Sequence, residues 1–133
     1  MIVELSEDDQ DLIDEFNDSI GGSPWVTFED SMIFSYGYTD NDKLLGAIQI
    51  EEWSNGVLGI SIATHPDHRR EKIASKLIQF VIETFTDAGY HGPLLMIIDE
   101  SNTASIELSK SLGFKKLQEC NSIDVEVYVK QVN

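Results

Sequence analysis

The chain has 133 residues, of which 41% are hydrophobic and 25% are charged, and this length and composition predict a single globular domain over residues 1–133. Nine lysine and arginine residues against 24 aspartate and glutamate residues give a net charge of -15, so we expect neither nucleic acid nor a membrane as a partner. A single cysteine, Cys120, excludes an intramolecular disulfide. The N-terminus lacks the features of a secretory leader and no apolar run reaches ~18 residues, so we expect a cytoplasmic protein.

The first segment of the sequence predicts a strand and then an acidic helix. Residues 2–5 resemble a short strand, and Ser6 with Asp9 three residues later is an N-cap signature. The apolar face of the predicted helix, which ends at residues 21–22, is formed by Leu12, Ile13, Phe16 and Ile20. Residues 4–18 hold eight carboxylates and no basic residue. This surface is either a solvated face or an electrostatic guide for cationic substrates.

Three strands are predicted next, at residues 32–38, 44–53 and 57–63. The links between them are short and rich in turn-forming residues, which is typical of an antiparallel meander. Several aromatic residues in this part of the chain are candidates for an acceptor pocket, although aromatic residues on one strand face more often belong to a core. They are Trp25, Phe28, Phe34, Tyr36 and Tyr38.

From residue 69 the apolar period changes to that of a helix. Four apolar residues lie four positions apart, namely Ile73, Leu77, Val81 and Phe85. They predict an amphipathic helix from residue 69 to the neighbourhood of Gly89.

The last part of the chain predicts a strand, a helix and a strand pair. Residues 94–98 are continuously apolar, as in a strand that is covered on both faces. Residues 103–112 predict a helix closed by Gly113, and residues 115–119 and 123–129 predict the strand pair. The whole order predicts an α+β (mixed α/β) fold with a mostly antiparallel sheet.

Basic residues are concentrated at the beginning of the predicted long helix. Four of the nine cationic residues fall within eight positions, and they are Arg69, Arg70, Lys72 and Lys76. Unpaired backbone N–H groups and the helix dipole favour an anion at such a place, and a diphosphate is the ligand that we favour. The alternative is that these side chains pair with neighbouring acids such as Asp67 and Glu71.

Two segments resemble the GNAT superfamily of N-acetyltransferases. Residues 64–74, THPDHRREKIA, resemble the acetyl-CoA segment of that family, with matches at Arg69, Ile73 and Ala74. Residues 102–114, NTASIELSKSLGF, resemble its second hallmark, an Asn that opens a helix ending in Leu-Gly-Phe. The matches there are Asn102, Leu108, Leu112, Gly113 and Phe114. The two segments stand in the family's order and in the predicted strand-to-helix context.

The resemblance implies a central, mostly antiparallel sheet of about six to seven strands with flanking helices, and transfer of an acetyl group from acetyl-CoA to a primary amine by direct attack. In that family the fourth strand splays from the fifth, and the pantetheine arm binds exposed backbone in the gap. By position, this backbone belongs here to Ile62, Ala63 and Thr64. Preorganised backbone donors of this kind stabilise the charge that develops on the thioester oxygen.

The resemblance also assigns the remaining cofactor-binding residues. The pyrophosphate is expected on the N–H groups of residues 69–74, which are Arg69, Arg70, Glu71, Lys72, Ile73 and Ala74. Asn102 either positions the pantetheine arm or the second helix, or caps that helix.

The sequence departs from the family pattern at sites that bear on chemistry. Lys72 stands where the first motif has its first glycine, so its side chain either crowds the pyrophosphate or adds a cation to it. Ser105 replaces a usual alanine. Ser109 stands where many members carry a tyrosine that protonates the thiolate, and we name it as a candidate catalytic residue. Serine is a poorer acid, so the alternatives are a water, unaided departure of the thiolate, or a low rate.

No general base is obvious, because residues 56–62 contain no carboxylate. Glu51 is our catalytic candidate, with Glu52, His65 or a water chain as alternatives. No metal site is expected, because the histidines have no second soft ligand nearby.

The leading interpretation is therefore an acetyl-CoA-dependent N-acetyltransferase that acts on a small-molecule or peptide amine. The runner-up is a GNAT-like domain that binds acyl-CoA or a protein partner and has little or no catalysis, and Lys72 and Ser109 support it. A third reading is an interaction protein with an acidic surface and no cofactor. The sequence leaves the acceptor and the formation of a homodimer open.

Overall fold

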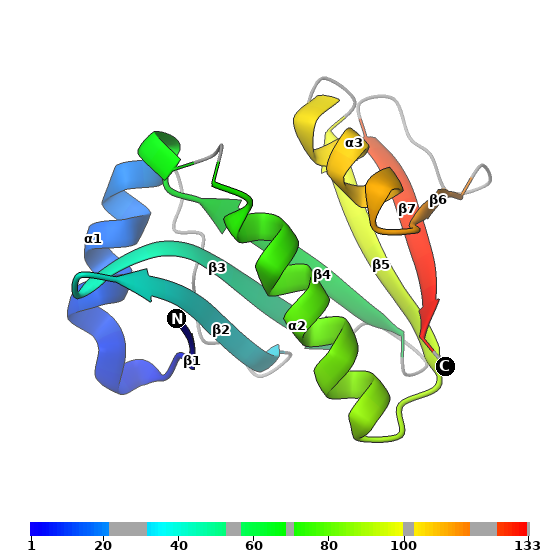
Figure 1. Cartoon of the computed structure of the whole chain (residues 1–133), viewed down its shortest axis with the longest axis horizontal. Helices are drawn as coiled ribbons and strands as arrows, with labels where there is room; N and C mark the ends of the chain where they lie inside the picture. The colour runs from blue at the N-terminus through cyan, green and yellow to red at the C-terminus, as the bar shows by residue number, and fades with distance from the viewer. Residues whose placement is uncertain (22–31, 53–56, 69–70, 100–102, 118–124, 133) are drawn as a thin grey trace.

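A computed structural model of the chain describes residues 1–21, 32–52, 57–68, 71–99, 103–117 and 125–132. Seven strands form one sheet in the order β1-β2-β3-β4-β5-β7-β6, as Figure 1 shows. The strands are β1 (Ile2–Glu4), β2 (Met32–Asp40), β3 (Lys43–Glu52), β4 (Leu58–Thr64), β5 (Gly92–Asp99), β6 (Lys115–Lys116) and β7 (Val125–Val132). The helices are α1 (Gln10–Ile20), α2 (Ile73–Asp87) and α3 (Thr103–Ser111), with 3-10 turns η1 (Glu7–Asp9) and η3 (Pro66–His68).

Every strand pair in this sheet is antiparallel except β4 with β5, which is parallel. The short link between β2 and β3 places Asn41 and Asp42 at φ 51° and 61°, the left-handed conformation that a tight hairpin turn requires. The predicted meander and the α+β class with a mostly antiparallel sheet are therefore confirmed.

Helix α1 follows from the capping signature in the sequence. Ser6 and Asp9 form a capping box, in which the Ser6 N–H donates to Asp9 Oδ2 over 2.9 Å. The cap opens the 3-10 turn η1, and α1 begins directly after it. Ile13 and Phe16 are buried against β3 in a small apolar cluster, which leaves the acidic residues on the exposed side of the helix.

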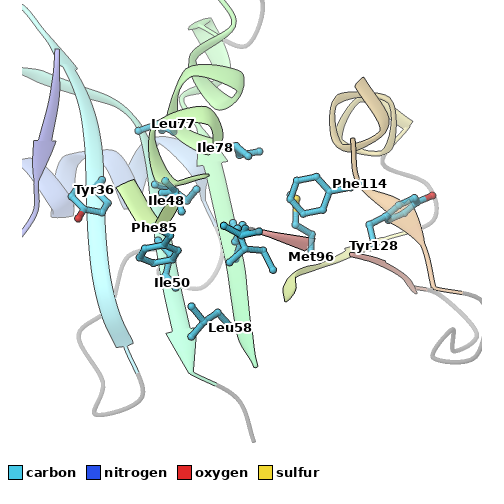
Figure 2. Close-up of a cluster of buried hydrophobic side chains, with 14 of the residues drawn as sticks. Tyr36, Ile48, Ile50, Leu58, Leu77, Ile78, Phe85, Met96, Phe114 and Tyr128 are labelled. Atoms are coloured by element: carbon cyan, nitrogen blue, oxygen red, sulfur yellow. The ribbon is translucent and has the colours of Figure 1, made fainter. Parts of the chain in front are cut away.

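The larger core lies on the other face of the sheet. Successive residues of a strand point to opposite faces, and Ile62 of β4 packs in the large cluster whereas Ala63 packs in the α1 cluster. Figure 2 shows the large cluster, to which α2 contributes Leu77 and Phe85, and in which Phe114 lies beside Met96. Helices α2 and α3 thus share one face, opposite α1 (Figure 1).

Both helices of this face end in the same hydrogen-bonded motif. Gly89 and Gly113 have φ values of 84° and 93°, and the next residue donates its N–H back into the last turn, Tyr90 to Phe85 O and Phe114 to Ser109 O, each over 2.9 Å. This is the Schellman arrangement, in which the residue after the glycine turns back onto the helix. It buries Phe114, of which 3% is exposed, and so explains the Leu-Gly-Phe ending.

The structure corrects three details of the predicted elements. The long helix begins at Ile73 rather than at residue 69, because η3 and a left-handed residue, Lys72, separate β4 from it. Strand β5 is not covered on both faces. Leu94, Met96 and Ile98 are buried, but Ile97 on the opposite face is 54% exposed. Strand β6 is only two residues long.

Candidate active site

Strands β4 and β5 are paired at one end and separate at the other. Their parallel register includes Leu58 with Leu94, Gly59 with Leu95 and Ile60 with Met96, and it stops there. Strand β4 continues to Thr64 along β3, and β5 continues to Asp99 along β7. The two strands therefore diverge toward the end where α2 begins, as Figure 1 shows.

Only alternate residues of β4 direct their backbone N–H and C=O groups toward the gap. The His65 N–H donates to Leu45 O over 2.7 Å, and residues with such bonds alternate along an antiparallel pair. Ser61 and Ala63 therefore direct their peptide groups toward β3. Ile62 and Thr64 direct theirs toward the gap, beyond the last paired residue of β5. Of the three residues predicted to hold a pantetheine arm, the register thus favours Ile62 and Thr64.

The chain reaches α2 through a tight double turn. His68 N–H donates to His65 O over 2.9 Å, and Glu71 N–H donates to His68 O over 3.2 Å. Lys72 then takes the left-handed conformation, with φ 60° and ψ 26°, and its carbonyl accepts the first helical bond from Lys76 N–H over 3.1 Å. Because α2 begins at Ile73, the N–H groups of Ile73, Ala74 and Ser75 precede the regular helical hydrogen bonds. An anion-binding helix end therefore adjoins the wide end of the gap.

The structure describes some of the residues that were predicted to bind the cofactor near α2. Arg69, Arg70 and Asn102 lie outside the described residues. Glu71 is already engaged through its N–H, whereas the Lys72 and Ala74 backbones stand at the helix end. Ile73 is 1% exposed, because its side chain anchors α2 in the core. The roles of these residues in binding stay predictions.

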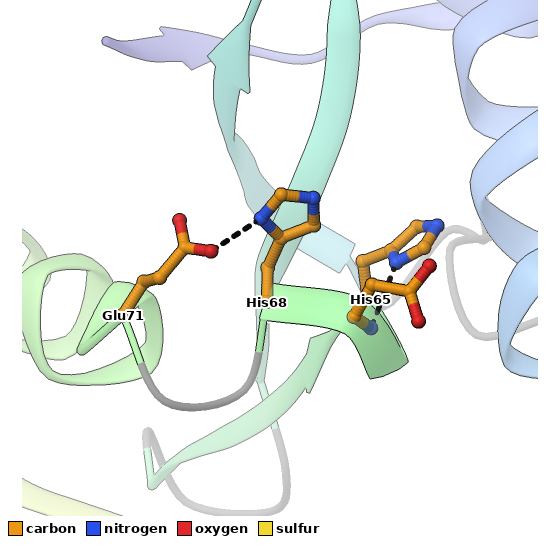
Figure 3. Close-up of polar contacts among 4 residues, drawn as sticks. His65, His68 and Glu71 are labelled. Carbon is orange, nitrogen blue, oxygen red and sulfur yellow. Dashed lines mark hydrogen bonds and ion pairs between the residues drawn. The ribbon is translucent and has the colours of Figure 1, made fainter.

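Side chains in the same turn form two short polar contacts, which Figure 3 shows. Nδ1 of His68 lies 2.6 Å from Oε2 of Glu71, and Nδ1 of His65 accepts the Asp67 N–H over 3.1 Å. The two imidazole rings are 5.4 Å apart and nearly perpendicular. The sequence analysis missed the His68–Glu71 pair, although the spacing of three residues across a turn was its signal.

Ser109 lies on the inner side of α3. Its side chain is 0% exposed, and its Oγ donates to Ile106 O over 2.8 Å. The hydroxyl proton thus satisfies a carbonyl of its own helix, a common arrangement for serine within a helix. A role for Ser109 as a proton donor stays a prediction.

Glu51 and its neighbours lie on the face opposite α2. Ile48 and Ile50 belong to the core under α2, so Gln49 and Glu51 point to the other face. Gln49 is buried and donates to Ser35 Oγ over 2.8 Å, and the half-buried Glu51 stands in register with Gly59 of β4. Glu51 is thus near the paired end of β4 and β5. Glu52, the alternative base, is exposed and points the other way.

The aromatic candidates for an acceptor pocket belong to the core side. Tyr36 is 8% exposed and packs edge-on against Phe80 of α2. Phe34 stacks on Tyr36 with ring centroids 6.0 Å apart. The Tyr38 ring lies 5.3 Å from the Lys76 ammonium, so it contacts a member of the predicted basic cluster. Trp25 and Phe28 lie outside the described residues.

Two features are absent from the described part of the chain. No helix there is long and apolar enough to cross a membrane. In the same residues, no group of three or more His, Cys, Asp or Glu side chains is placed to hold a metal ion.

The sequence matches the acetyltransferase (GNAT) family over residues 3–114. It is 33% identical over 82 residues to UPF0157 protein YqkA of Bacillus subtilis (strain 168), a match that covers 62% of this chain and only 23% of that protein. The fold is similar to that of the ribosomal-protein-S18-alanine N-acetyltransferase from Escherichia coli, with a TM-score of 0.82, 18% identity and coverage of 100% and 94% of the two chains. It is also similar to yncA from Salmonella typhimurium, described with its cofactor acetyl-CoA, with a TM-score of 0.75, 17% identity and coverage of 100% and 94%. At these identities the structural matches show the fold.

Proposed function

The chain belongs to the acetyltransferase (GNAT) family, and from this premise we propose that it transfers an acetyl group from acetyl-CoA to a primary amine of a small molecule or peptide. The observation that carries this proposal is the divergence of β4 from β5 after Ile60 and Met96, beside the first turn of α2. The gap between β4 and β5 offers backbone donors, and the first turn of α2 offers N–H groups at a helix end. A thioester joined to a diphosphate needs both.

The residues that the structure describes fit such a cofactor. Lys72 keeps the left-handed backbone that glycine adopts easily, and its side chain is exposed. The departure from the family's glycine therefore preserves the backbone path into α2. We assign the diphosphate to the N–H groups of Lys72, Ile73 and Ala74, and the pantetheine arm to the peptide groups of Ile62 and Thr64.

Bound acetyl-CoA supplies an activated acyl group. The chain's own contribution begins with the N–H groups of β4 in the gap, which lower the barrier by donating to the oxygen on which charge develops. The acceptor amine must be neutral to attack, and we assign its proton to Glu51 on the face opposite α2 through a water chain, because Glu51 stands beside Gly59 at the paired end of β4 and β5. The attacking nitrogen forms the amide bond as the carbon–sulfur bond breaks, and the thiolate leaves with its electron pair.

Calorimetry with acetyl-CoA and thiol release on a panel of amines test this proposal. The wild type should bind acetyl-CoA and release thiol with at least one amine. Glu51→Gln should lower kcat by about 10- to 100-fold with little change in cofactor Kd, whereas Glu52→Gln, on the adjacent residue of the opposite face, should leave both unchanged. Equal losses in the two variants would refute the role of Glu51, and absence of binding would refute the cofactor site.

A second function, cofactor binding with little catalysis, is favoured by Ser109. Its hydroxyl is buried and bonded to Ile106 O, so the position where the family pattern has an acidic tyrosine holds a side chain engaged in its own helix. Binding of acetyl-CoA without thiol release on any amine would support this alternative.

A further inference from the structure

On the face of the sheet opposite α2, the first residues beyond the paired part of β4 and β5 are both exposed. Ile60 and Met96 form the last pair between these strands, and both pack in the large core under α2. Successive residues of a strand point to opposite faces. The next residue of each strand, Ser61 on β4 and Ile97 on β5, therefore points away from α2, and each side chain is exposed there. These two residues stand on either side of the point from which the strands diverge (Figure 1).

The β4 side of this point is polar. Ser61 is in register with Gln49 of β3, and Gln49 is in register with Ser35 of β2. Gln49 and Ser35 are buried, and Gln49 Nε2 donates to Ser35 Oγ over 2.8 Å. Ser61 is thus the exposed end of a row of three polar side chains. Its hydroxyl oxygen can accept a hydrogen bond from the N–H of an amine.

The β5 side is apolar. Ile97 is 54% exposed and is in register with Val127 of β7, which is buried. On the same face of β5, two residues nearer the paired end, Leu95 is half-buried. Ile97 is therefore the exposed end of an apolar strip formed by Leu95, Ile97 and Val127, and not an isolated surface side chain. Covering such a side chain with an apolar group of a ligand removes apolar surface from water, which is favourable.

The acceptor has to reach the thioester at this point. With the pantetheine arm on the peptide groups of Ile62 and Thr64, the acyl group lies beside the diverging part of β4. The α2 face there belongs to the large core, so the amine approaches from the opposite face, on which Glu51 also stands. Between Ser61 and Ile97, its nitrogen faces a hydroxyl on one side and its carbon chain faces an apolar side chain on the other.

We propose that the acceptor is a primary amine with an apolar chain next to the amino group, and that Ile97 selects it by contact with this chain while Ser61 accepts a hydrogen bond from the amine. This inference rests on the proposed function and names its substrate class. A second ammonium group in place of the chain's end would lose hydration against a strip that carries no carboxylate. The expected preference is thus the reverse of guidance of cationic substrates by the acidic residues 4–18.

The test compares kcat/KM for matched amines, measured as thiol release at constant pH and salt. Butylamine and trimethylenediamine have the same number of non-hydrogen atoms and differ at the far end, which is a methyl group in one and an ammonium group in the other. Rates are expressed per neutral amino group, because the second ammonium lowers the pKa of the first. The wild type should prefer butylamine by about fivefold or more. From ethylamine to butylamine, kcat/KM should rise by about two- to fourfold per methylene.

Variants on the two sides of the gap should act differently. Ile97→Thr keeps the branched β-carbon but makes the surface polar, so it should lower the preference for butylamine over ethylamine by about three- to fivefold and leave the Kd for acetyl-CoA unchanged. Ser61→Ala should lower kcat/KM for all amines by a similar factor, about two- to tenfold, and leave the preference unchanged. Val129→Thr is the matched control, because Val129 lies on the same face but on β7, beyond β5 from the gap. It should retain the wild-type values.

The possible outcomes separate the inference from the function. If Ile97→Thr and the wild type show the same preference among amines, or if the wild type prefers trimethylenediamine, the inference is wrong while the acetyltransferase function stands. If the wild type releases thiol with no amine, the proposed function is wrong and the inference falls with it. Thermal melts show whether each variant is folded. Should Ile97→Thr fail to fold, Ile97→Val, which removes one methylene, should still lower the preference by about two- to fourfold.

Discussion

At position 72 a lysine takes a backbone conformation that costs an ordinary residue about 1–2 kcal/mol. The chain accepts this strain because the left-handed residue connects the turn at His68 and Glu71 to the first helical bond, from Lys76 N–H to Lys72 O. The sequence showed only that Lys72 replaces the first glycine of the family's motif. The torsion angles show why the family pattern has one there, and that this chain keeps the conformation without the residue that makes it easy.

Ser109 carries the prediction at the residue scale. Because its hydroxyl is buried and bonded to Ile106 O, Ser109→Ala should leave turnover within about twofold of wild type and change the free energy of unfolding by about 1 kcal/mol or less. Ser109→Tyr should destabilise the fold by about 1–3 kcal/mol or more, because the site is closed on all sides. Denaturant unfolding and thiol-release rates measure the two effects. A large fall in turnover for the alanine variant, with stability preserved, would instead assign Ser109 a chemical role.

At the scale of elements, the position of α2 determines where the helix end meets the gap. Gly46 of β3 lies directly under Ile73, the first residue of α2, and a Cβ added at Gly46 would stand 2.5 Å from Ile73 Cγ2. A side chain at position 46 would therefore force the strand or the first turn of α2 to shift. The sequence pattern placed Ile73 in an apolar stripe, but nothing in the sequence indicated that Gly46 is the residue against which it packs.

We therefore predict that Gly46→Ala destabilises the protein by about 1–3 kcal/mol and weakens acetyl-CoA binding, because α2 must move at its first turn. Ile73→Leu removes the methyl group on the β-carbon that clashes. The double variant Gly46→Ala with Ile73→Leu should thus recover part of both losses. Thermal unfolding and calorimetry on the two single variants and the double variant form a double-mutant cycle, and strictly additive effects would contradict the contact.

At the scale of the molecule, a net charge of -15 makes the folded state repel itself. Among the described residues, His68 pairs with Glu71 and Lys116 pairs with Glu126. The Lys116–Glu126 pair belongs to a small network in which Tyr128 also donates to Glu126 over 2.7 Å. Burial, and then that hydrogen bond, raise the pKa of Tyr128 to about 12.

Raising NaCl from about 20 mM to about 300 mM should therefore raise Tm by about 3 °C or more, because screening weakens repulsion over distances beyond about 10 Å. Differential scanning calorimetry at constant pH measures the shift. A Tm that falls with salt would mean that attractive pairs outweigh repulsion in this fold.

The sequence by itself determined the class of fold and the order of most elements. The cap formed by Ser6 and Asp9 indicated the first helix. The four-residue spacing from Ile73 to Phe85 predicted the buried stripe of α2, and Gly113 indicated the end of α3. These signals are local: a cap, a period and a left-handed glycine act within a few residues of the chain. The two segments that resemble the GNAT family are local signals as well, and the chain's membership of that family is shown.

Only the tertiary structure decided which residues face one another. The end of β4–β5 pairing after Ile60 and Met96, the exposed Ile97 in an apolar run, and the inward turn of Ser109 depend on neighbours far away in sequence. So does the choice of Ile62 and Thr64 over Ala63, which follows from the register with β3. The sequence of a strand shows that successive residues direct their peptide groups to opposite sides. The neighbouring strands determine which of these peptide groups form hydrogen bonds and which stay open. For that reason the sequence located the site to within a segment, and the packing of the sheet selected the groups within it.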